Sequence, residues 1–487
     1  MYTSTRSKLN KNASTAIIDG LAFDGGLYIK GDLEQIDINS LKNKSYKEIA
    51  FIILRSFLDD FSDEDVFDAI NKAYDSKFAY EDVVNVKKCN DAYFLELFHG
   101  PTMAFKDVAL SILPLLMVKS KKIQKQNNKT VILTATSGDT GSATLSGFHA
   151  DENTEMVVLY PTNGVSLIQE KQMLSFKNER LHPVAIKGNF DDAQTLVKKI
   201  FSDENLRAEI IKNNIDLTSA NSINIGRLIP QIVYYFYTYI DLLKKEEINE
   251  TEKINFVVPT GNFGNILACY IAKHMGLPVS KIICASNSNN VLTDFFNKHE
   301  YNRNREFYKT LSHSMDILIS SNLERLLYYL SGDEKVVSGL MKDLNTSGLY
   351  KLPEDIKNKL GEFYAEYSTE EETLEAIKKV YEENKYLIDT HTAVAYSVFQ
   401  KYQENTSDET KTVIASTAHP YKFPKAVCKA LGIDSSSDEF TLINVLNEVT
   451  GVEIPNPIKK LKCDFEKEVI CKEEAYNYVC NKIVKRG

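Results

Sequence analysis

Three observations in the sequence predict an α/β fold, in which a mainly parallel sheet is covered by helices on both faces. From about Tyr93 onward, short apolar runs alternate with segments of helical periodicity. Such alternation is typical of parallel strands joined by helical crossovers and buried on both faces. Polar loops follow several of the runs, and ligands bind at the carboxyl ends of the strands in such sheets.

The expected strands and helices follow the chain in order. We expect strands at residues 130–136, 155–160, 182–188, 253–259, 281–287 and 412–416. Helices are expected at residues 191–201, 228–243 and 266–274, and a buried helix is expected to begin near Lys106. The loops after the strands should therefore meet at one edge of the sheet.

Charge and composition exclude several kinds of partner. The formal net charge of -9 argues against binding to a nucleic-acid backbone. No apolar run reaches the roughly 18 residues that span a bilayer, and the polar first residues do not resemble a signal peptide. Seven cysteines stand without a CxxC pair or metal-ligand spacing, which indicates reduced thiols and no metal. We therefore expect a cytoplasmic protein without nucleic-acid or membrane partners.

Lys106 is the first candidate for chemistry. It lies in the string HGPTMAFKD, between a turn and an apolar stretch that predicts a buried helix. Burial disfavours the charged ammonium and lowers its pKa, which frees the amine to act as a nucleophile or base. From this stretch alone, a lysine that extends from a helix start to water is the commoner explanation.

Two glycine-containing loops offer anion sites. Residues 261–265, GNFGN, join a strand to a helix start, so backbone N–H groups and the helix dipole favour a phosphate. The string matches neither the dinucleotide fingerprint nor the Walker loop, and a simple glycine-rich turn explains it equally well. Residues 137–141, SGDTG, offer donors for a carboxylate, although an N-capping turn has the same composition.

A second anion site is indicated at residues 219–227, SANSINIGR. Asn221, Ser222 and Arg227 could bind a phosphate, because the planar guanidinium donates two parallel hydrogen bonds. Such a sequence more commonly forms an Asn/Ser turn with a solvated arginine. Together, a candidate imine-forming lysine, a phosphate loop and a second anion site indicate pyridoxal phosphate with a phosphorylated substrate.

The motifs also carry a resemblance that covers nearly the whole chain in collinear order. They read STR, GLAFDGGLY, HGPTMAFKD, ATSGDTG, SANSINIGR, VPTGNFGN, LSHSMDI, DTHTAVA and STAHPYKFP. In these strings the chain resembles the threonine synthases of many bacteria and fungi, fold-type II pyridoxal-phosphate enzymes related to the tryptophan synthase β subunit. The chain departs from the usual pattern at Thr390, where proline is common, and at Tyr421, where a small residue is frequent.

The resemblance implies two parallel-sheet lobes covered by helices, and a division of the chain. Residues 93–288 and 387–440 would form the pyridoxal-phosphate-binding catalytic lobes, and residues 1–92 an N-terminal cap domain. Residues 289–386 are expected to be a helical insertion, and residues 441–487 a C-terminal helical segment.

The resemblance also implies the roles of the site residues. Lys106 would bind the cofactor as an imine, Thr417 would meet the pyridine nitrogen, and Asp139 would lie near the 3'-oxygen. The cofactor phosphate would be held by Gly261, Asn262, Phe263, Gly264 and Asn265. The substrate carboxylate would face Thr136, Ser137 and Thr140, and the substrate phosphate Asn221, Ser222, Arg227 and Asn262.

The implied reaction is a β,γ-replacement that converts O-phospho-L-homoserine and water into L-threonine and phosphate. A phospho-lyase that shares the cofactor and phosphate sites but releases a 2-oxo acid and ammonia stays open, because product and not motif separates the two. A non-catalytic relative would lack the lysine, whereas Lys106 is present. We expect a monomer or homodimer.

Overall fold

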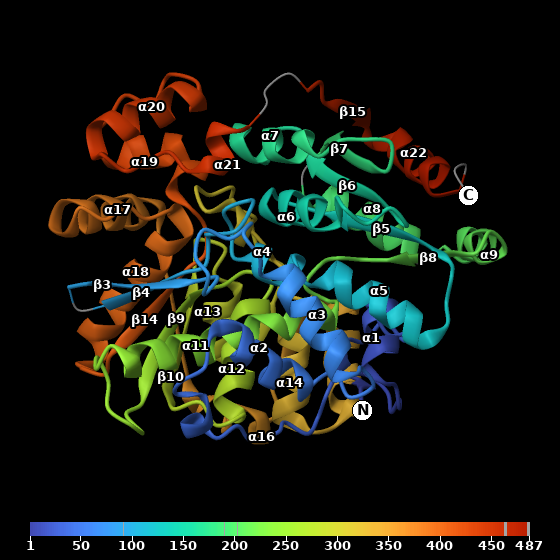
Figure 1. Ribbon diagram of the computed structural model, residues 1–487, viewed down its shortest axis with the longest axis horizontal. Coiled ribbons are helices and arrows are strands. Elements are labelled where there is room, and N and C mark those ends of the chain that lie inside the picture. Colours follow the sequence, from blue (N-terminus) through green and yellow to red (C-terminus); the bar gives the residue numbers. More distant parts are fainter. Residues whose placement is uncertain (91, 189, 202, 462–464, 485–487) are drawn as a thin grey trace.

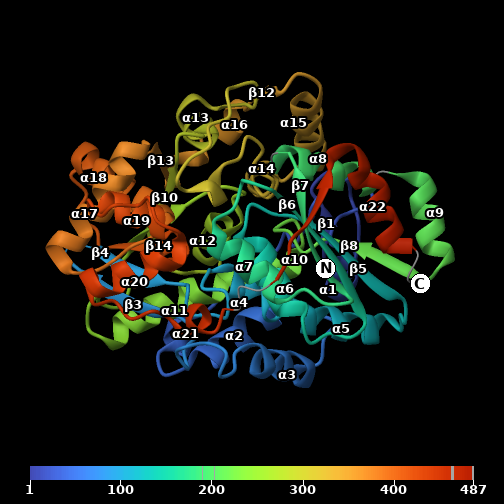
Figure 2. The same cartoon turned by 90° about the horizontal axis from the view of Figure 1, so that it is seen from above.

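The chain builds two sheets that lie side by side (Figures 1 and 2). The computed structural model describes residues 1–90, 92–188, 190–201, 203–461 and 465–484. One sheet has six strands in the order β13 (Phe363–Tyr367), β10 (Val279–Ser286), β9 (Ile254–Pro259), β14 (Thr412–Ser416), β4 (Ala92–Glu96) and β3 (Asn85–Cys89). The other has five, in the order β15 (Glu468–Cys471), β7 (Leu181–Lys187), β6 (Thr154–Pro161), β5 (Lys129–Ala135) and β8 (Ile215–Thr218).

All strand pairs within the two sheets are parallel except β3 with β4. The strands β4, β6, β9 and β14 are buried at every position. This explains why they appear in the sequence as continuous apolar runs rather than as alternating ones. The predicted α/β fold with two parallel-sheet lobes is confirmed, and each of the six expected strands is present.

Helices cover both sheets. The five-stranded sheet is flanked by α6 (Asp139–Phe148), α7 (Leu167–Ser175), α8 (Phe190–Phe201), α9 (Glu204–Lys212) and α22 (Lys472–Val484). Beside the six-stranded sheet lie α11 (Pro230–Lys244), α12 (Gly264–His274), α13 (Val291–Lys298) and α18 (Thr390–Thr406). Farther from the sheet, α17 (Glu370–Asn384) packs on α18, α19 (Pro424–Ala430) on α17, and α20 (Glu439–Thr450) on α19, and α21 (Asn456–Lys459) lies next to α7 (Figure 1). Helix α11 is apolar around nearly its whole circumference, as expected of a helix enclosed by other elements.

The N-terminal region packs onto this framework. Its elements are β1 (Thr3–Ser4), α1 (Ala13–Asp19), β2 (Tyr28–Ile29), α2 (Tyr46–Arg55) and α3 (Asp63–Ala73). Helix α2 begins at a capping box in which Ser45 and Glu48 satisfy each other's backbone N–H groups. Helices α1 and α3 contact α5 (Leu113–Gln124), and α2 contacts α11. Most apolar side chains of this expected cap belong to the same core cluster as apolar side chains from both sheets.

The description of residues 289–386 as a helical insertion is wrong in one respect. Besides α13, α14 (Leu323–Ser331), α15 (Glu334–Thr346), α16 (Glu354–Lys357) and α17, the segment contains β11 (Glu300–Asn302), β12 (Leu349–Lys351) and β13. Strand β13 pairs with β10 and so extends the six-stranded sheet. Residues 441–487 likewise contribute β15 to the other sheet. Both strands are short and only partly buried, so their identity as strands depends on the neighbour with which they pair.

One finding concerns membranes. Among the described residues, no helix combines the length and the apolar character that crossing a bilayer requires.

Candidate active site

A cavity of about 440 Å³ lies where the loops after the strands converge. Every site residue predicted from the sequence lines it: Lys106, Thr136, Ser137, Asp139, Thr140, Asn221, Ser222, Arg227, Gly261, Asn262, Phe263, Gly264, Asn265 and Thr417. The volume is within the range of about 300–1,000 Å³ that is usual for small-molecule sites. The fold therefore brings together residues that are more than 300 positions apart in the chain.

Lys106 is the first residue of α4 (Lys106–Leu110), as the sequence predicted. The preceding turn is closed by Asp107, whose carboxylate accepts from the Thr102 backbone N–H at 2.8 Å and from its hydroxyl at 2.6 Å. The backbone N–H of Phe105 donates to the Thr417 carbonyl at 2.8 Å. Main-chain pairing thus holds Thr417 beside Lys106.

The Lys106 ammonium lies between one carboxylate and one aromatic ring. Its Nζ is 3.3 Å from Asp139 Oδ2 and 4.9 Å from the centroid of the Phe105 ring. Burial lowers the pKa of Lys106, the Asp139 carboxylate opposes this shift, and the Arg227 and Lys422 cations add to it. The amine therefore loses its proton more readily than an exposed lysine, as a nucleophile or base requires.

The loop between β9 and α12 has the features of a phosphate cradle. Phe263, the residue before α12, has a φ of 61°, and its buried ring stacks on Phe296 at 6.1 Å between centroids. Helix α12 begins without a side-chain cap, so its first N–H groups are free to meet an anion. Because the Phe263 ring points into the core, only its backbone can serve the predicted cofactor contact.

Asn265 adds a side-chain donor to this cradle. Its Oδ1 accepts hydrogen bonds from the hydroxyls of Tyr234 and Tyr235, the latter at 2.6 Å. Its Nδ2 is buried and has no hydrogen-bond partner among the described residues, although Asn265 lines the cavity. A buried amide donor without a partner is costly, so this atom is suited to a bound acceptor.

The SGDTG loop turns sharply into α6. Gly138 has a φ of 124°, and a Cβ there would lie 2.4 Å from the Gln169 side chain, so only glycine fits. The Thr136 hydroxyl accepts from the N–H groups of Gly138 at 3.0 Å and Gly141 at 2.8 Å. Thr136 therefore shapes the loop and accepts from one N–H of the first turn of α6, and Ser137 and Asp139 line the cavity at this helix start.

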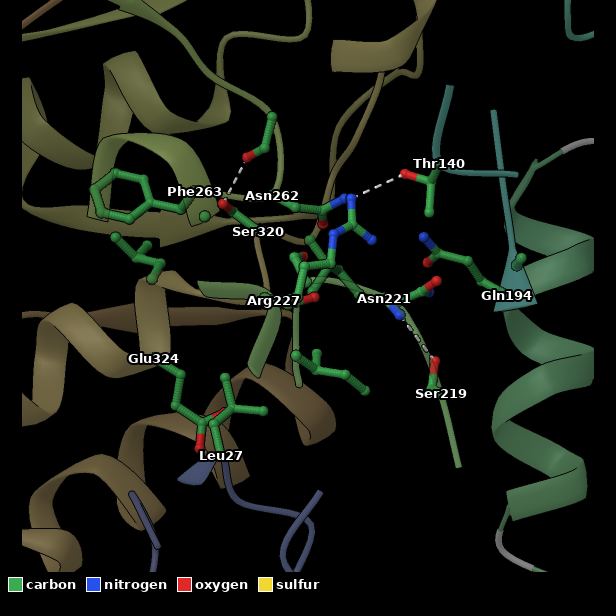
Figure 3. Close-up of a pocket in the computed structure, with 18 of the residues that line it drawn as sticks. Leu27, Thr140, Gln194, Ser219, Asn221, Arg227, Asn262, Phe263, Ser320 and Glu324 are labelled. Atoms are coloured by element: carbon green, nitrogen blue, oxygen red, sulfur yellow. Dashed lines mark hydrogen bonds between the residues drawn. The ribbon is translucent and has the colours of Figure 1, made fainter. Parts of the chain in front are cut away.

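Arg227 is the most unusual charge in the cavity. It lies in α10 (Ile225–Leu228) and is only 5% exposed. Its guanidinium donates to the Ala220 carbonyl at 2.7 Å and to the Thr140 hydroxyl at 3.3 Å (Figure 3). No carboxylate within the described part of the chain forms an ion pair with it. Burial lowers its pKa to about 10, so the side chain remains a cation at neutral pH.

Figure 3 shows how the residues around Arg227 are arranged. The side chains of Asn262 and Thr140 extend toward the guanidinium, and Asn221 lies beside it. The Asn221 Oδ1 is buried without a partner among the described residues. Thr140, predicted at the substrate carboxylate, thus also contacts the group predicted to bind the substrate phosphate.

Comparison with known proteins identifies the family. Residues 84–418 match the pyridoxal-phosphate dependent enzyme family, residues 1–74 the threonine synthase N terminus, and residues 392–461 the threonine synthase C-terminal family. The threonine synthase of Saccharomyces cerevisiae is 37% identical, over 88% of this chain and 89% of the yeast protein.

The chain belongs to the threonine synthase family. The crystal structure of a pyridoxal-phosphate-bound threonine synthase from Brucella melitensis superposes with a TM-score of 0.86 at 35% identity, covering 99% of each chain. Human threonine synthase-like 1 is 38% identical over 89% of this chain, which spans 60% of the human protein. The fold-type II classification and the pyridoxal-phosphate cofactor predicted from the sequence are thereby confirmed.

The cavity fits the cofactor of the threonine synthase family on its own geometry. Lys106 provides a buried amine, the start of α12 provides free N–H groups, and Asn265 provides an amide donor without a partner. These are the groups that an aldehyde and a phosphate require.

The sequence did not reveal the groups that support this threonine synthase site. Arg325 is fully buried and donates to the carbonyls of Tyr28 at 2.9 Å and Ile223 at 2.6 Å, and it also bonds the Asn322 side chain. Asn322 in turn donates from Nδ2 to the Asn262 carbonyl at 3.0 Å. This chain of contacts joins the segment before Arg227 to the phosphate loop. No local pattern marks Arg325, because its partners are distant backbone carbonyls.

His391 is a further cavity residue to which the sequence assigned no role. It belongs to the DTHTAVA motif and bonds Asp389 through Nδ1 at 2.8 Å. Its Nε2 is buried without a partner among the described residues. The motif itself was the available signal, since a histidine two residues after a helix-capping aspartate is held by that carboxylate.

Proposed function

We propose that this protein converts O-phospho-L-homoserine and water into L-threonine and inorganic phosphate. Arg227 carries the proposal: it is a buried cation without a carboxylate partner among the described residues, in the cavity that contains Lys106. A cavity with a phosphate cradle for the cofactor and a second, charged anion site fits a substrate that is itself phosphorylated.

The cofactor contacts are assigned to three segments of the chain. Lys106 would bind the cofactor aldehyde, the backbone of residues 261–265 with the Asn265 amide would bind its phosphate, and Thr417 would meet the ring nitrogen. When bound, the cofactor supplies an electron-accepting ring that acidifies the substrate Cα–H bond. Thr417 is a neutral partner, so it does not force the ring nitrogen to stay protonated, as an aspartate would.

Lys106 is assigned the proton transfers at the substrate. Its Nζ would lie beside the bound substrate and would remove the Cα proton. Burial lowers its pKa, which increases the fraction of free base at neutral pH. The nearby Asp139 carboxylate, 3.3 Å away, then stabilises the ammonium that forms.

The two ends of the substrate are assigned to different loops. The start of α6, with Ser137 and Thr140, would bind the carboxylate, which places Cα next to Lys106. Arg227, Asn221, Ser222 and Asn262 would bind the phosphate. The interaction of Arg227 with the phosphate would be strongest as the phosphate leaves Cγ, because negative charge then accumulates on the departing oxygen next to a desolvated guanidinium.

The alternative is a phospho-lyase that releases a 2-oxo acid and ammonia. It would use the same cofactor and phosphate contacts up to the departure of phosphate, so the product decides between the two. Purified protein loaded with pyridoxal phosphate should be incubated with O-phospho-L-homoserine while threonine, phosphate, ammonia and 2-oxo acid are quantified. We expect threonine and phosphate in equal amounts. A 2-oxo acid as the main carbon product would contradict the synthase assignment.

We also propose that the enzyme acts as a monomer or homodimer in the cytoplasm. The residues assigned to the cofactor and the substrate all belong to this chain. The cysteines in the described part of the chain are free thiols, in agreement with a reducing compartment.

A further inference from the structure

A second buried lysine, Lys422, faces the carboxylate that contacts Lys106. It ends the short 3-10 helix η4 (Pro420–Lys422) after β14 and has no exposed surface. Its Nζ lies 2.8 Å from Asp139 Oδ1 and donates to the Thr102 carbonyl at 2.7 Å. Lys422 does not line the cavity, so it can influence the chemistry through its contact with Asp139 and through its charge, but not by touching a bound molecule.

Asp139 connects the two lysines through its two oxygens. Oδ1 accepts from Lys422 and from Gln169 Nε2 at 2.8 Å, whereas Oδ2 accepts from Lys106 at 3.3 Å and from the Ser314 hydroxyl at 3.2 Å. The carboxylate is only 2% exposed, so its orientation is fixed by four protein donors. One oxygen of the carboxylate thus faces Lys422 and the other faces Lys106.

The single negative charge of Asp139 lies between the positive charges of Lys422 and Lys106. Burial by itself raises the pKa of Asp139, but Lys422 first and then Lys106 more than reverse this, and the pKa lies well below its usual range. Asp139 is therefore ionised across the neutral range. Without Lys422, its whole charge would act on Lys106 in a site of low polarity.

We propose that Lys422 is a positioning residue for Lys106: its ammonium holds the Asp139 carboxylate ionised and aimed, so that Lys106 faces a compensated pair rather than a lone buried charge. The pairing lets Lys106 pass between its protonated and free forms, which both its attachment to the cofactor and the transfer of a substrate proton require. The inference deepens the proposed function and rests on the assignment of Lys106 to the cofactor.

Other titratable groups face Lys106, Asp139 and Lys422, and these other groups are not substituted in the test. They are Asp107 of α4, Arg227 of α10, His313 of the 3-10 helix η2 (His313–Met315), and His391 of α18 with its partner Asp389. Burial lowers the pKa of His313 to about 4, so it stays neutral through the range to be titrated.

The test compares the pH at which the cofactor attached to Lys106 loses its visible absorption band. Replacing Lys422 with methionine removes a cation, so the midpoint should rise by about one pH unit or more. Replacing Asp139 with asparagine removes an anion, and the midpoint should fall by a similar amount. The variant with both changes should return to within about half a unit of the parent, since the two charges offset each other.

Two further variants serve as controls. Lys422→Arg keeps the charge and should leave the midpoint near that of the parent, and it tests the idea if the methionine variant does not fold. Lys401→Met removes a partly exposed lysine of α18 that pairs with Glu372 at 2.8 Å, and it should change nothing.

The outcomes separate this inference from the assignment on which it rests. Single-variant midpoints that do not move, that move in the same direction, or that are not restored in the double variant would overturn the role of Lys422. Failure of the parent protein to attach the cofactor at Lys106 would instead overturn the assignment of Lys106. A structural role alone would not produce opposite shifts that cancel.

Discussion

Two regions of the cavity are built to meet an anion, and they use different chemistry. The loop before α12 offers backbone N–H groups and the Asn265 amide, and residues 261–265 contain no charged side chain. The segment before α10 contributes a buried guanidinium, that of Arg227. On the proposed function, the first region holds a phosphate that stays, and the second holds a phosphate that leaves.

The difference has an energetic reason. Several backbone N–H groups that donate to a phosphate, together with a helix dipole, suffice to retain a group whose charge does not change. Bonds to a charged group contribute about 1.5–3 kcal/mol and respond to charge that develops during the reaction. On the proposed function, the buried cation of Arg227 therefore lies where charge changes during the reaction.

The largest effect is expected at Lys106, which lies between the two regions. Lys106→Ala should abolish turnover and covalent attachment of the cofactor, because the same amine is anchor and proton carrier. Both phosphate regions stay intact, so reversible cofactor binding should persist at raised concentration. Borohydride reduction followed by mass analysis measures the attachment. A variant that still yields a reducible cofactor–protein bond contradicts the assignment of Lys106.

The second prediction tests the charged region. Arg227→Leu should lower kcat/KM by about ten- to a hundredfold, with a higher KM and a lower kcat, while the yellow cofactor is retained. Inorganic phosphate should inhibit the parent more strongly than the variant. Steady-state kinetics and cofactor titration measure both effects.

A matched control is available in Arg305, which pairs with Asp294 at 2.8 Å and does not line the cavity. Arg305→Leu should leave both KM and cofactor affinity unchanged. If Arg227→Leu instead releases the cofactor while its loaded fraction turns over normally, the two anion regions have been assigned in the wrong order.

The third prediction tests the neutral region. Asn265→Ala removes an amide donor from the phosphate loop and should raise the Kd for the cofactor by up to about tenfold. At saturating cofactor, KM for the substrate should change less than about twofold, the reverse of the Arg227→Leu pattern. Fluorescence titration of cofactor-free protein gives the Kd. Equal losses in both constants would mean that the two regions are not independent.

The smallest effect concerns pH. Burial lowers the pKa of Arg227 to about 10, so its charge is present below that value and is lost as pH rises through it. A substrate phosphate gains its second charge above about pH 6. The ratio of kcat/KM between parent and Arg227→Leu should therefore be greatest between these limits and fall on both sides. A ratio that does not change from about pH 5 to about pH 10.5 would show that charge pairing is not its cause.

The sequence by itself determined the fold class, the family, the cofactor and the strands that are apolar along their whole length. Those strands are visible because burial on both faces demands continuous apolar runs, as in β6 and β9. The lysine and the three loops were visible because each lies in a string of turn residues or polar groups next to an apolar segment. Their convergence in one cavity agrees with the predicted set, and the role of each residue remains a proposal.

Only the tertiary structure decided which partners these groups have. Strands β13 and β15 are short and only partly buried, and they form because β10 and β7 pair with them. The buried Arg325 and Lys422 bind carbonyls and a carboxylate that lie between about 100 and 320 residues away along the chain. A sequence pattern reports local spacing, whereas the environment of a buried charge depends on long-range packing, so these supporting groups could not be read from the sequence.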